Sequence, residues 1–206
     1  RTGSAAALKD QANAGSFAAN LLMRGSERMS RLEIKDAFDK LKAQVNVGGN
    51  AEGVSASVTT TRENLAPALA LLAEVLSKPA FSAQEFDEYQ RSRISRIEQD
   101  IPEPQPLAVN AFQRLVDATP EGHVNHVLTL PAQLAKLRAV TVEQVKAFHS
   151  AFYGANNATV AAVGEFDAPA LKAQLGALFG AWSSAQPYVR IPATMKNVAG
   201  EKVALE

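Results

Sequence analysis

The chain has few side chains that could carry chemistry, and its histidines are the first to consider. It contains three histidines and no cysteine. His123 and His126 are separated by two residues, a spacing that could suit a metal on a helical turn. A metal site needs three or four ligands, and no acidic residue stands between these two. We therefore interpret the pair as part of an ordinary loop, and His149 as a residue on a helix face.

Two other motifs have chemical interpretations that their surroundings do not support. The stretch GGNAEG, residues 48–53, is rich in glycine but lacks the Lys-Ser/Thr ending and the following helix of a phosphate-binding loop, so we predict a hairpin turn. The run RSRISR, residues 91–96, is basic, but acidic residues flank it and no aromatic platform accompanies it. We predict a solvated helix face and no nucleic-acid partner.

Composition excludes several classes of protein. The 206 residues include 21 basic and 21 acidic side chains, a balance that indicates neither nucleic acid nor an anionic membrane as partner. The lack of cysteine excludes disulfides, thiolate metal sites and a cysteine nucleophile. No apolar run is long enough to span a bilayer. The hydrophobic content of 47% can support a core, so we expect a folded domain with no membrane span.

Hydrophobic periodicity predicts a chain rich in helices. Ser30 with Glu33, and Ser82 with Glu85, have the spacing of capping boxes at helix starts, and Thr141 with Gln144 caps a later helix. Three prolines in IPEPQP must end the helix that precedes them. The predicted helices cover residues 14–22, 30–41, 64–77, 82–101, 107–118, 141–152 and 168–179.

Alternating apolar and small polar residues predict the strands. Residues 44–50 (QVNVGGN) and 54–61 (VSASVTTT) indicate an antiparallel hairpin, and residues 158–164 (ATVAAVG) a further short strand. Residues 119–131 are rich in turn formers and predict a loop. We predict an α+β fold, a two-layer sandwich in which helices cover one face of a mostly antiparallel sheet.

The order of these elements resembles the insulinase/pitrilysin-type zinc peptidases, which include the mitochondrial processing peptidase. The most specific part is residues 130–182, which are similar to the family's run of loop, helix, Tyr-Gly-x-Asn-Asn, strand, Gly-x-Phe-Asp and helix. LLMRGS, residues 21–26, and residues 64–94 resemble the family's first catalytic helix and its later pair of helices. The resemblance covers nearly the whole chain and implies a metallopeptidase-like fold.

In active members of this family the first helix carries His-x-x-Glu-His, which binds zinc and activates a water molecule. With Gly25 as the glycine that closes the motif, its chemical positions fall on Ser16, Ala19 and Asn20. The third ligand, a Glu on a later helix, falls on Arg96, a cation that cannot bind a metal. The resemblance therefore implies no catalytic residue and no metal in this domain. We also expect Arg96 to be partly buried between the two helices and to contact Ser16 and Asn20.

The resemblance also implies how peptides are bound. The family's counterpart of QVNVGGN lies at the sheet edge beside the active cleft, where the substrate is added as a strand through backbone hydrogen bonds. The corresponding residues here are Val45, Asn46, Val47, Gly48 and Gly49. An open edge must be paired or covered. Peptide substrates are therefore expected partners, and zinc is expected only in an active partner domain.

Family members are assembled from similar domains, in one chain or in two subunits, that close into a chamber. One part carries zinc and a degenerate part completes the wall, and this chain resembles the degenerate part. We expect residues 1–186 to form one peptidase-like domain of a longer bacterial, periplasmic protein, and residues 187–206 to begin the connection to the next domain. Two alternatives stay open, an active zinc endopeptidase with an unorthodox metal site and a free-standing peptide-binding module.

Overall fold

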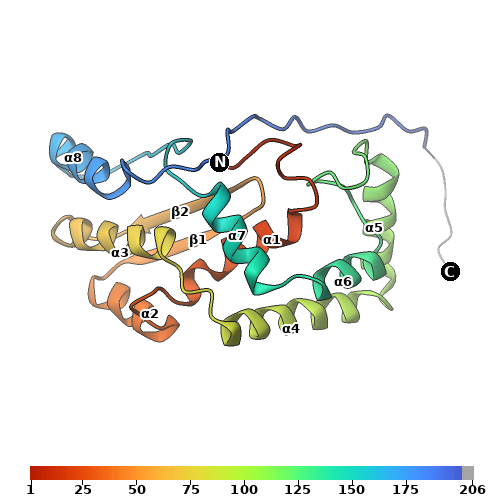
Figure 1. Ribbon diagram of the computed structural model, residues 1–206, viewed down its shortest axis with the longest axis horizontal. Coiled ribbons are helices and arrows are strands. Elements are labelled where there is room, and N and C mark those ends of the chain that lie inside the picture. The colour runs from red at the N-terminus through yellow and green to blue at the C-terminus, as the bar shows by residue number, and fades with distance from the viewer. Residues whose placement is uncertain (201–206) are drawn as a thin grey trace.

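The helix α1 (Ala12–Leu21) lies at the centre of the fold, against the sheet and α7. The computed structural model describes residues 1–200 (Figure 1). Small and apolar residues give α1 a buried face that includes Ala14, Phe17 and Ala18. A short 3-10 turn, η1 (Leu22–Arg24), follows, and Gly25 ends it with a φ of 140°, a conformation that favours glycine.

The other helices agree closely with the periodicity of the sequence. The capping boxes of Ser30 with Glu33 and of Thr141 with Gln144 are both formed, and Ser82 caps its helix through the Glu85 amide. The helix over residues 130–138 was not predicted, since this stretch was expected to be loop ahead of the helix that begins at Thr141. In chain order the helical elements are α2 (Arg31–Lys40), η2 (Arg62–Asn64), α3 (Leu65–Ser77), α4 (Ala83–Asp100), α5 (Pro104–Val116), α6 (Leu130–Arg138), α7 (Val142–Phe152) and α8 (Ala168–Phe179).

The predicted hairpin is confirmed and positions the candidate site. Strands β1 (Gln44–Asn50) and β2 (Gly53–Thr59) pair antiparallel from Gln44 with Thr59 to Asn50 with Gly53. Valines at alternate positions pack against the core, whereas the opposite face is exposed and carries only uncharged residues. The described residues combine many helices with this antiparallel sheet, so the α+β class is confirmed (Figure 1).

The predicted strand over residues 158–164 is wrong. In the described part of the chain the sheet contains β1 and β2, and residues 158–163 are exposed and belong to no strand. The side chain of Val163 is fully exposed and Val160 is 62% exposed. A β-prone sequence forms a strand only when a neighbouring backbone is available to pair with it, and nothing in the described residues supplies one.

The core lies between α1, the hairpin, α3 and α7. Phe17 on α1 contacts the rings of Phe86 and Tyr89 on α4, at centroid distances of 5.3 and 5.0 Å. Phe148 on α7 is 2% exposed and stacks on Phe152. The contacts of Phe17 join α1 to α4, whereas the stacking of Phe148 on Phe152 lies within α7.

Residues 187–200 cross the molecule without regular structure, from the N-terminus towards α5 (Figure 1). The Val189 amide donates to Gly3 O at 2.9 Å, and the Lys196 amide donates to Val116 O at 2.8 Å, at the end of α5. The expected domain boundary at residues 186–187 stays a prediction. No helix in the described residues is long and apolar enough to cross a membrane.

Candidate functional site

The degenerate motif positions lie where α1 meets β1. A side chain at Gly15 would overlap Ala51 in the hairpin turn and Phe148 on α7, so the glycine lets the helix backbone approach the sheet closely. Ala19 is 1% exposed, whereas Ser16 and Asn20 are only partly buried. Of the three positions, two therefore carry neutral polar groups beside the hairpin and one is filled by a methyl group.

Asn20 connects the motif helix to the edge strand. Its Nδ2 amide donates to Ser16 O at 2.7 Å, within the helix, and to Gly49 O at 3.3 Å, on β1. At the position where the family resemblance places the second zinc-binding histidine, Asn20 thus makes hydrogen bonds that join the helix to β1. A side chain on Gly49 itself would overlap the backbone of Gly53 and Val54, so this part of β1 requires glycine.

The prediction for Arg96 is wrong. Arg96 is exposed, and within residues 1–200 it makes no hydrogen bond or ion pair. The part of α4 that contacts α1 is Phe86 and Tyr89, which pack on Phe17 about two turns before Arg96. Burying a cation requires an anionic partner, and the vacated motif offers only neutral groups, so solvent is the better environment for Arg96.

A different arginine bridges the two helices. Arg24 lies just after α1, and its guanidinium is 2.9 Å from Glu85 and 3.2 Å from Glu88 of α4. The same guanidinium lies over the ring of Tyr89, 5.4 Å from its centroid. Arg24 does not stand out in the sequence because its carboxylate partners lie far along the chain. Its position in LLMRGS, directly before Gly25, was the available signal.

The residues expected to form the substrate-binding edge all lie in β1. In the described residues, β2 pairs with one edge of β1 and no strand pairs with the other. In two antiparallel strands, residues that lie opposite each other alternate between hydrogen-bonded and non-hydrogen-bonded pairs. The hairpin has a two-residue turn, so Asn50 and Gly53 form a hydrogen-bonded pair. The backbone groups of Val45, Val47 and Gly49 therefore point away from β2. The Gly49 carbonyl already accepts a hydrogen bond from Asn20.

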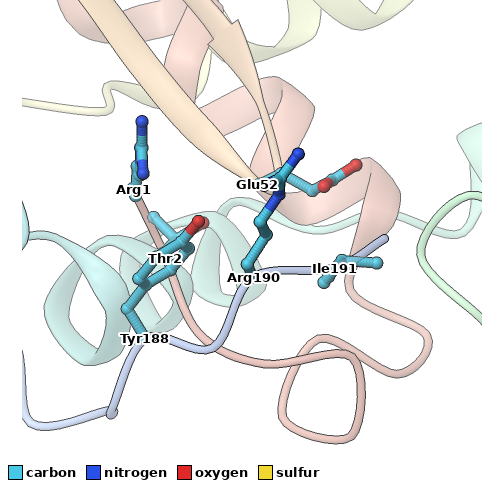
Figure 2. A pocket seen from close by; sticks show the side chains of 6 residues that line it. All are labelled: Arg1, Thr2, Glu52, Tyr188, Arg190 and Ile191. Atoms are coloured by element: carbon cyan, nitrogen blue, oxygen red, sulfur yellow. The ribbon is translucent and has the colours of Figure 1, made fainter. Parts of the chain in front are cut away.

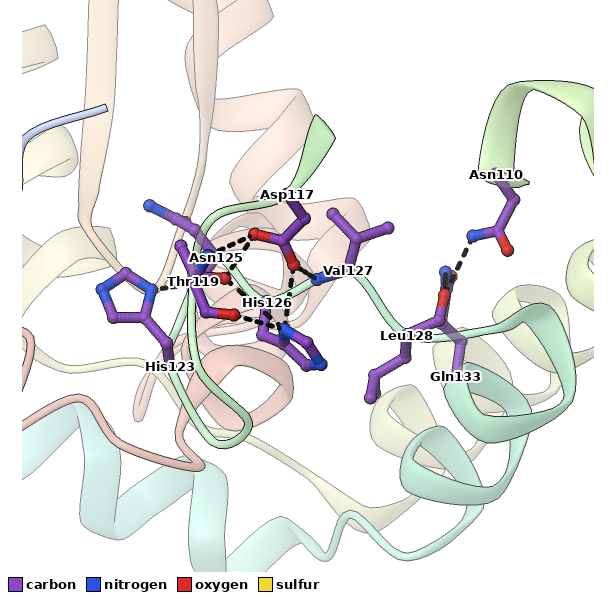
Figure 3. A network of polar contacts seen from close by, with 9 residues as sticks. All are labelled: Asn110, Asp117, Thr119, His123, Asn125, His126, Val127, Leu128 and Gln133. Carbon is purple, nitrogen blue, oxygen red and sulfur yellow. Dashed lines mark hydrogen bonds and ion pairs between the residues drawn. The ribbon is translucent and has the colours of Figure 1, made fainter. Parts of the chain in front are cut away.

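The two loop histidines do not act together (Figure 3). His126 Nδ1 lies 2.9 Å from Asp117 Oδ2 and 3.1 Å from Thr119 O, and because both oxygens are acceptors, Nδ1 carries the hydrogen. His123 Nδ1 instead accepts the Asn125 amide at 3.2 Å. The structure thus supplies an acidic partner for His126 that the sequence spacing did not indicate.

Asp117 fixes the loop that contains these histidines. Its carboxylate accepts hydrogen bonds from the amides of Thr119 and Val127, at 2.7 and 2.9 Å, and from the Thr119 hydroxyl at 2.6 Å. Burial acts to raise the pKa of Asp117, but these hydrogen bonds and the charge of His126 outweigh it and lower the pKa to about 2. The carboxylate is therefore a structural anion.

His149, interpreted from the sequence as a helix-face residue, is mostly buried. Its Nε2 donates to Leu76 O at 2.8 Å, and its ring packs beside Phe81, Tyr153 and Trp182. Burial lowers the pKa of His149, and the hydrogen bond to Leu76 O offsets this lowering only in part. Tyr153 has a buried hydroxyl without a partner in the described residues, and burial raises its pKa.

A cavity of about 250 Å³ lies at the hairpin turn, away from the motif positions (Figure 2). The guanidinium of Arg1 lies 5.7 Å from the ring centroid of Tyr188. The cavity is lined by Arg1, Thr2, Glu52, Tyr188, Arg190 and Ile191. In residues 1–200 as a whole, no group of three or more His, Cys, Asp or Glu side chains is placed to hold a metal.

The chain matches two protein-family models. Residues 1–118 match the family described as insulinase, peptidase family M16. This chain belongs to the insulinase family of peptidases, M16. Residues 139–206 match a second M16 model, which is described as the peptidase M16 inactive domain.

Several solved structures share the fold of this M16 chain. An M16 inactive domain from Pseudomonas fluorescens has a TM-score of 0.77 and 22% identity, covering 93% of this chain and 46% of that one. A protease from Helicobacter pylori has a TM-score of 0.71 and 17% identity over 93% and 46% of the two chains. The periplasmic protease PqqL from Escherichia coli has a TM-score of 0.70 and 16% identity over 94% and 22%.

The M16 chain spans less than half the length of these solved proteins. At such identities the likeness shows the fold alone. No curated protein sequence gives a match. The inactive-domain description belongs to residues 139–206, whereas Ser16, Ala19 and Asn20 lie in the part that matches the insulinase model.

Proposed function

We propose that this M16 domain is a catalytically inactive part of a longer zinc peptidase, in which it completes the proteolytic chamber and binds peptide substrates for an active zinc-bearing domain or subunit. The observation that carries the proposal is the hydrogen bond from Asn20 to Gly49. It uses a former ligand position to hold the motif helix against the strand that presents an open edge. The scaffold for substrate binding is thus retained at a place where the zinc-binding groups are absent.

The free part of the edge defines how a peptide is bound. Backbone groups of Val45 and Val47 point outward, and a peptide in extended conformation can pair with both through main-chain hydrogen bonds. The Gly49 carbonyl is engaged by Asn20, so pairing is weaker at that end of β1. Main-chain pairing gives affinity without selecting a sequence, which suits a domain that holds substrates for a separate catalytic centre.

The exposed face of the hairpin makes a wall without charge. Gln44, Asn46, Ser55, Ser57 and Thr59 alternate with the core-facing valines and are exposed. Amide and hydroxyl groups form hydrogen bonds with water or with polar groups of a peptide. Because they are uncharged, they do not select for the charge of the side chains of a bound peptide. Such a face suits substrates of either charge.

The similar solved proteins support a proposal for the partner of this domain and for the compartment in which the protein lies. The solved M16 proteins are more than twice as long as this chain, which supports a partner domain in the same polypeptide. PqqL is described as a periplasmic protease, and we propose the periplasm for the parent protein of this domain. Zinc is expected only in the active partner.

Peptide binding can be tested with a backbone-modified probe. A fluorescein-labelled Thr-Val repeat peptide of about eight residues should bind the domain, and N-methylation of alternate residues should abolish binding in one register but leave it in the other. Val47→Pro removes an outward amide of β1, and Ala56→Pro, its partner in the ladder, removes the matching amide of β2. Loss of binding is expected for Val47→Pro only. Equal binding by both methylated peptides would refute addition at this edge.

The alternatives are separated by metal analysis and by peptide hydrolysis. After dialysis the purified domain is expected to hold less than stoichiometric zinc by elemental analysis and to leave the probe peptide uncleaved. Stoichiometric zinc with cleavage would instead establish an enzyme with an unorthodox site. Tight peptide binding that does not change when the partner domain is present would favour a free-standing binding module.

A further inference from the structure

The helix α5 has its polar and apolar faces reversed. The residue that it buries is Asn110, which is 8% exposed and donates through Nδ2 to Leu128 O at 2.9 Å (Figure 3). Three of its large apolar side chains point outward, with Phe112 61%, Val109 49% and Leu115 37% exposed, while Leu107 and Val116 are half-buried. A surface helix normally turns its apolar stripe to the core and its polar residues to water.

The exposed apolar residues of α5, together with half-buried Val116, form one continuous face. At 3.6 residues per turn, Val109, Phe112 and Val116 lie one above the other, and Ala108 and Leu115 lie directly beside them. The single charged residue of the helix, Arg114, projects from a different side. We call this surface, formed by residues 108, 109, 112, 115 and 116, the α5 face. A contiguous apolar surface on a folded protein commonly marks an interaction site.

Residues 187–200 bring the outgoing polypeptide to the α5 face. The Lys196 amide donates to Val116 O at 2.8 Å, and Met195 pairs with Asp117, the residue that follows the helix. Met195 is 73% exposed and adds apolar surface at this end of α5. In Figure 1 this segment reaches the same side of the molecule as α5. Any chain that continues from here begins beside the exposed helix.

We propose that the α5 face is the docking surface for the domain that follows in the same polypeptide. The proposal rests on the proposed function in taking this domain as one part of a longer peptidase. The solved M16 proteins match this chain over 93% of its length while being more than twice as long. A covalent tether that leaves next to the α5 face raises the effective concentration of the following domain at that surface. A second copy of the domain has no such advantage.

Thiol accessibility tests the coverage of the α5 face directly, because the chain contains no cysteine. Phe112→Cys places a thiol on the α5 face, and Leu32→Cys places a matched thiol on α2, where Leu32 is 66% exposed. Each variant is made in the 206-residue chain and in the full-length polypeptide, and the rate of maleimide labelling is measured. The full-length protein without either substitution supplies the background.

Phe112→Cys is expected to label quickly in the short chain and roughly 10- to 100-fold more slowly in the full-length protein, because a covered thiol reacts only while the two domains are apart. Leu32→Cys is expected to label at the same rate in both. Equal rates for Phe112→Cys would overturn the proposal. Slow labelling in the short chain that speeds up on dilution would also overturn it, since a second copy would then cover the face.

A charge on the α5 face gives an independent readout. Phe112→Glu should leave the unfolding midpoint of the short chain unchanged, because the side chain is exposed there, and should uncouple its unfolding from that of the following domain in the full-length protein. Leu32→Glu should change neither. A lowered midpoint in the short chain would show that Phe112 is packed within this domain, against the proposal. Peptide binding at β1 is measured separately, so failure here leaves the proposed function standing.

Discussion

The side-chain amide of Asn20 hydrogen-bonds the Gly49 carbonyl at 3.3 Å and joins the degenerate motif helix to the edge strand. The same Nδ2 atom donates to Ser16 O at 2.7 Å, so the amide is shared between the helix and the sheet. No metal is needed to hold the two elements together, since this bond and the packing of Gly15 on Ala51 already do so.

Removing the amide tests this tie. We expect Asn20→Ala to lower the free energy of unfolding by about 0.5–1 kcal/mol, because a lost hydrogen bond is partly offset by the better helix propensity of alanine. Asn13→Ala is the control, as Asn13 lies in the same helix. Urea denaturation of both variants measures the difference. If Asn13→Ala and Asn20→Ala behave alike, the bond to Gly49 contributes nothing in solution.

Gly15 and Gly176 are both helical glycines, and we expect opposite responses to alanine. A side chain at Gly15 would overlap Ala51 and Phe148, so Gly15→Ala should destabilise the fold by about 1–3 kcal/mol. Gly176 in α8 has open space around its Cβ position, and Gly176→Ala should stabilise by about 0.5–1 kcal/mol. Thermal and chemical unfolding provide the comparison. A stable Gly15→Ala variant would mean that α1 can move away from the hairpin.

Arg24, and not Arg96, is expected to stabilise the junction of α1 and α4. Arg24 contacts Glu85, Glu88 and the ring of Tyr89, and Arg24→Ala should cost about 1 kcal/mol. Arg96 is exposed, and Arg96→Ala should change the free energy of unfolding by less than about 0.5 kcal/mol. Denaturant titration of the two variants checks both values. A larger loss of unfolding free energy for Arg96→Ala would indicate that the side chain of Arg96 is buried.

Acid is expected to release the loop that Asp117 holds. The pKa of Asp117 is lowered in the folded state from 3.8 to about 2, so its contribution to stability is complete above the unfolded value and is lost as the pH falls towards 2. Asp117→Asn should therefore unfold with a weaker pH dependence in this window and be less stable at neutral pH. Exposed Asp87 on α4 provides the control variant, Asp87→Asn. Stability of both variants is followed by circular dichroism from pH 5 to 2, and parallel curves would argue against the network.

His149 should make stability sensitive to mild acid. Burial lowers its pKa from 6.5, so the folded protein binds the proton less readily than the unfolded chain. The stabilisation is complete above the unfolded pKa and falls as the pH drops from that value through the folded one. His149→Gln keeps a donor for Leu76 O without titrating, and it should flatten this part of the curve. An unchanged slope in His149→Gln, followed by circular dichroism over the same pH range, would contradict a buried imidazole at this position.

The sequence by itself determined the elements whose signals are local. The Ser30–Glu33 and Thr141–Gln144 capping boxes form as their spacing predicts, because the interacting groups lie within one helical turn. The hairpin forms because alternation and the Ala51-Glu52 turn specify the same register. The absence of histidine from residues 1–122 is likewise a property of the sequence alone, and the placing of the zinc motif on Ser16, Ala19 and Asn20 stays a prediction.

The tertiary structure decided everything that depends on a distant partner. Residues 158–163 have the composition of a strand but form none in the described chain, since pairing needs a neighbouring backbone. Arg96 stays in solvent while Arg24 finds two carboxylates on α4, and Asp117 meets His126 across a loop. Asn110 turns inward and Phe112 outward because one buried amide bond and the position of α5 at the edge set the orientation of that helix. Periodicity reports which residues share a face, but only the packed fold decides whether that face meets the core, water or another domain.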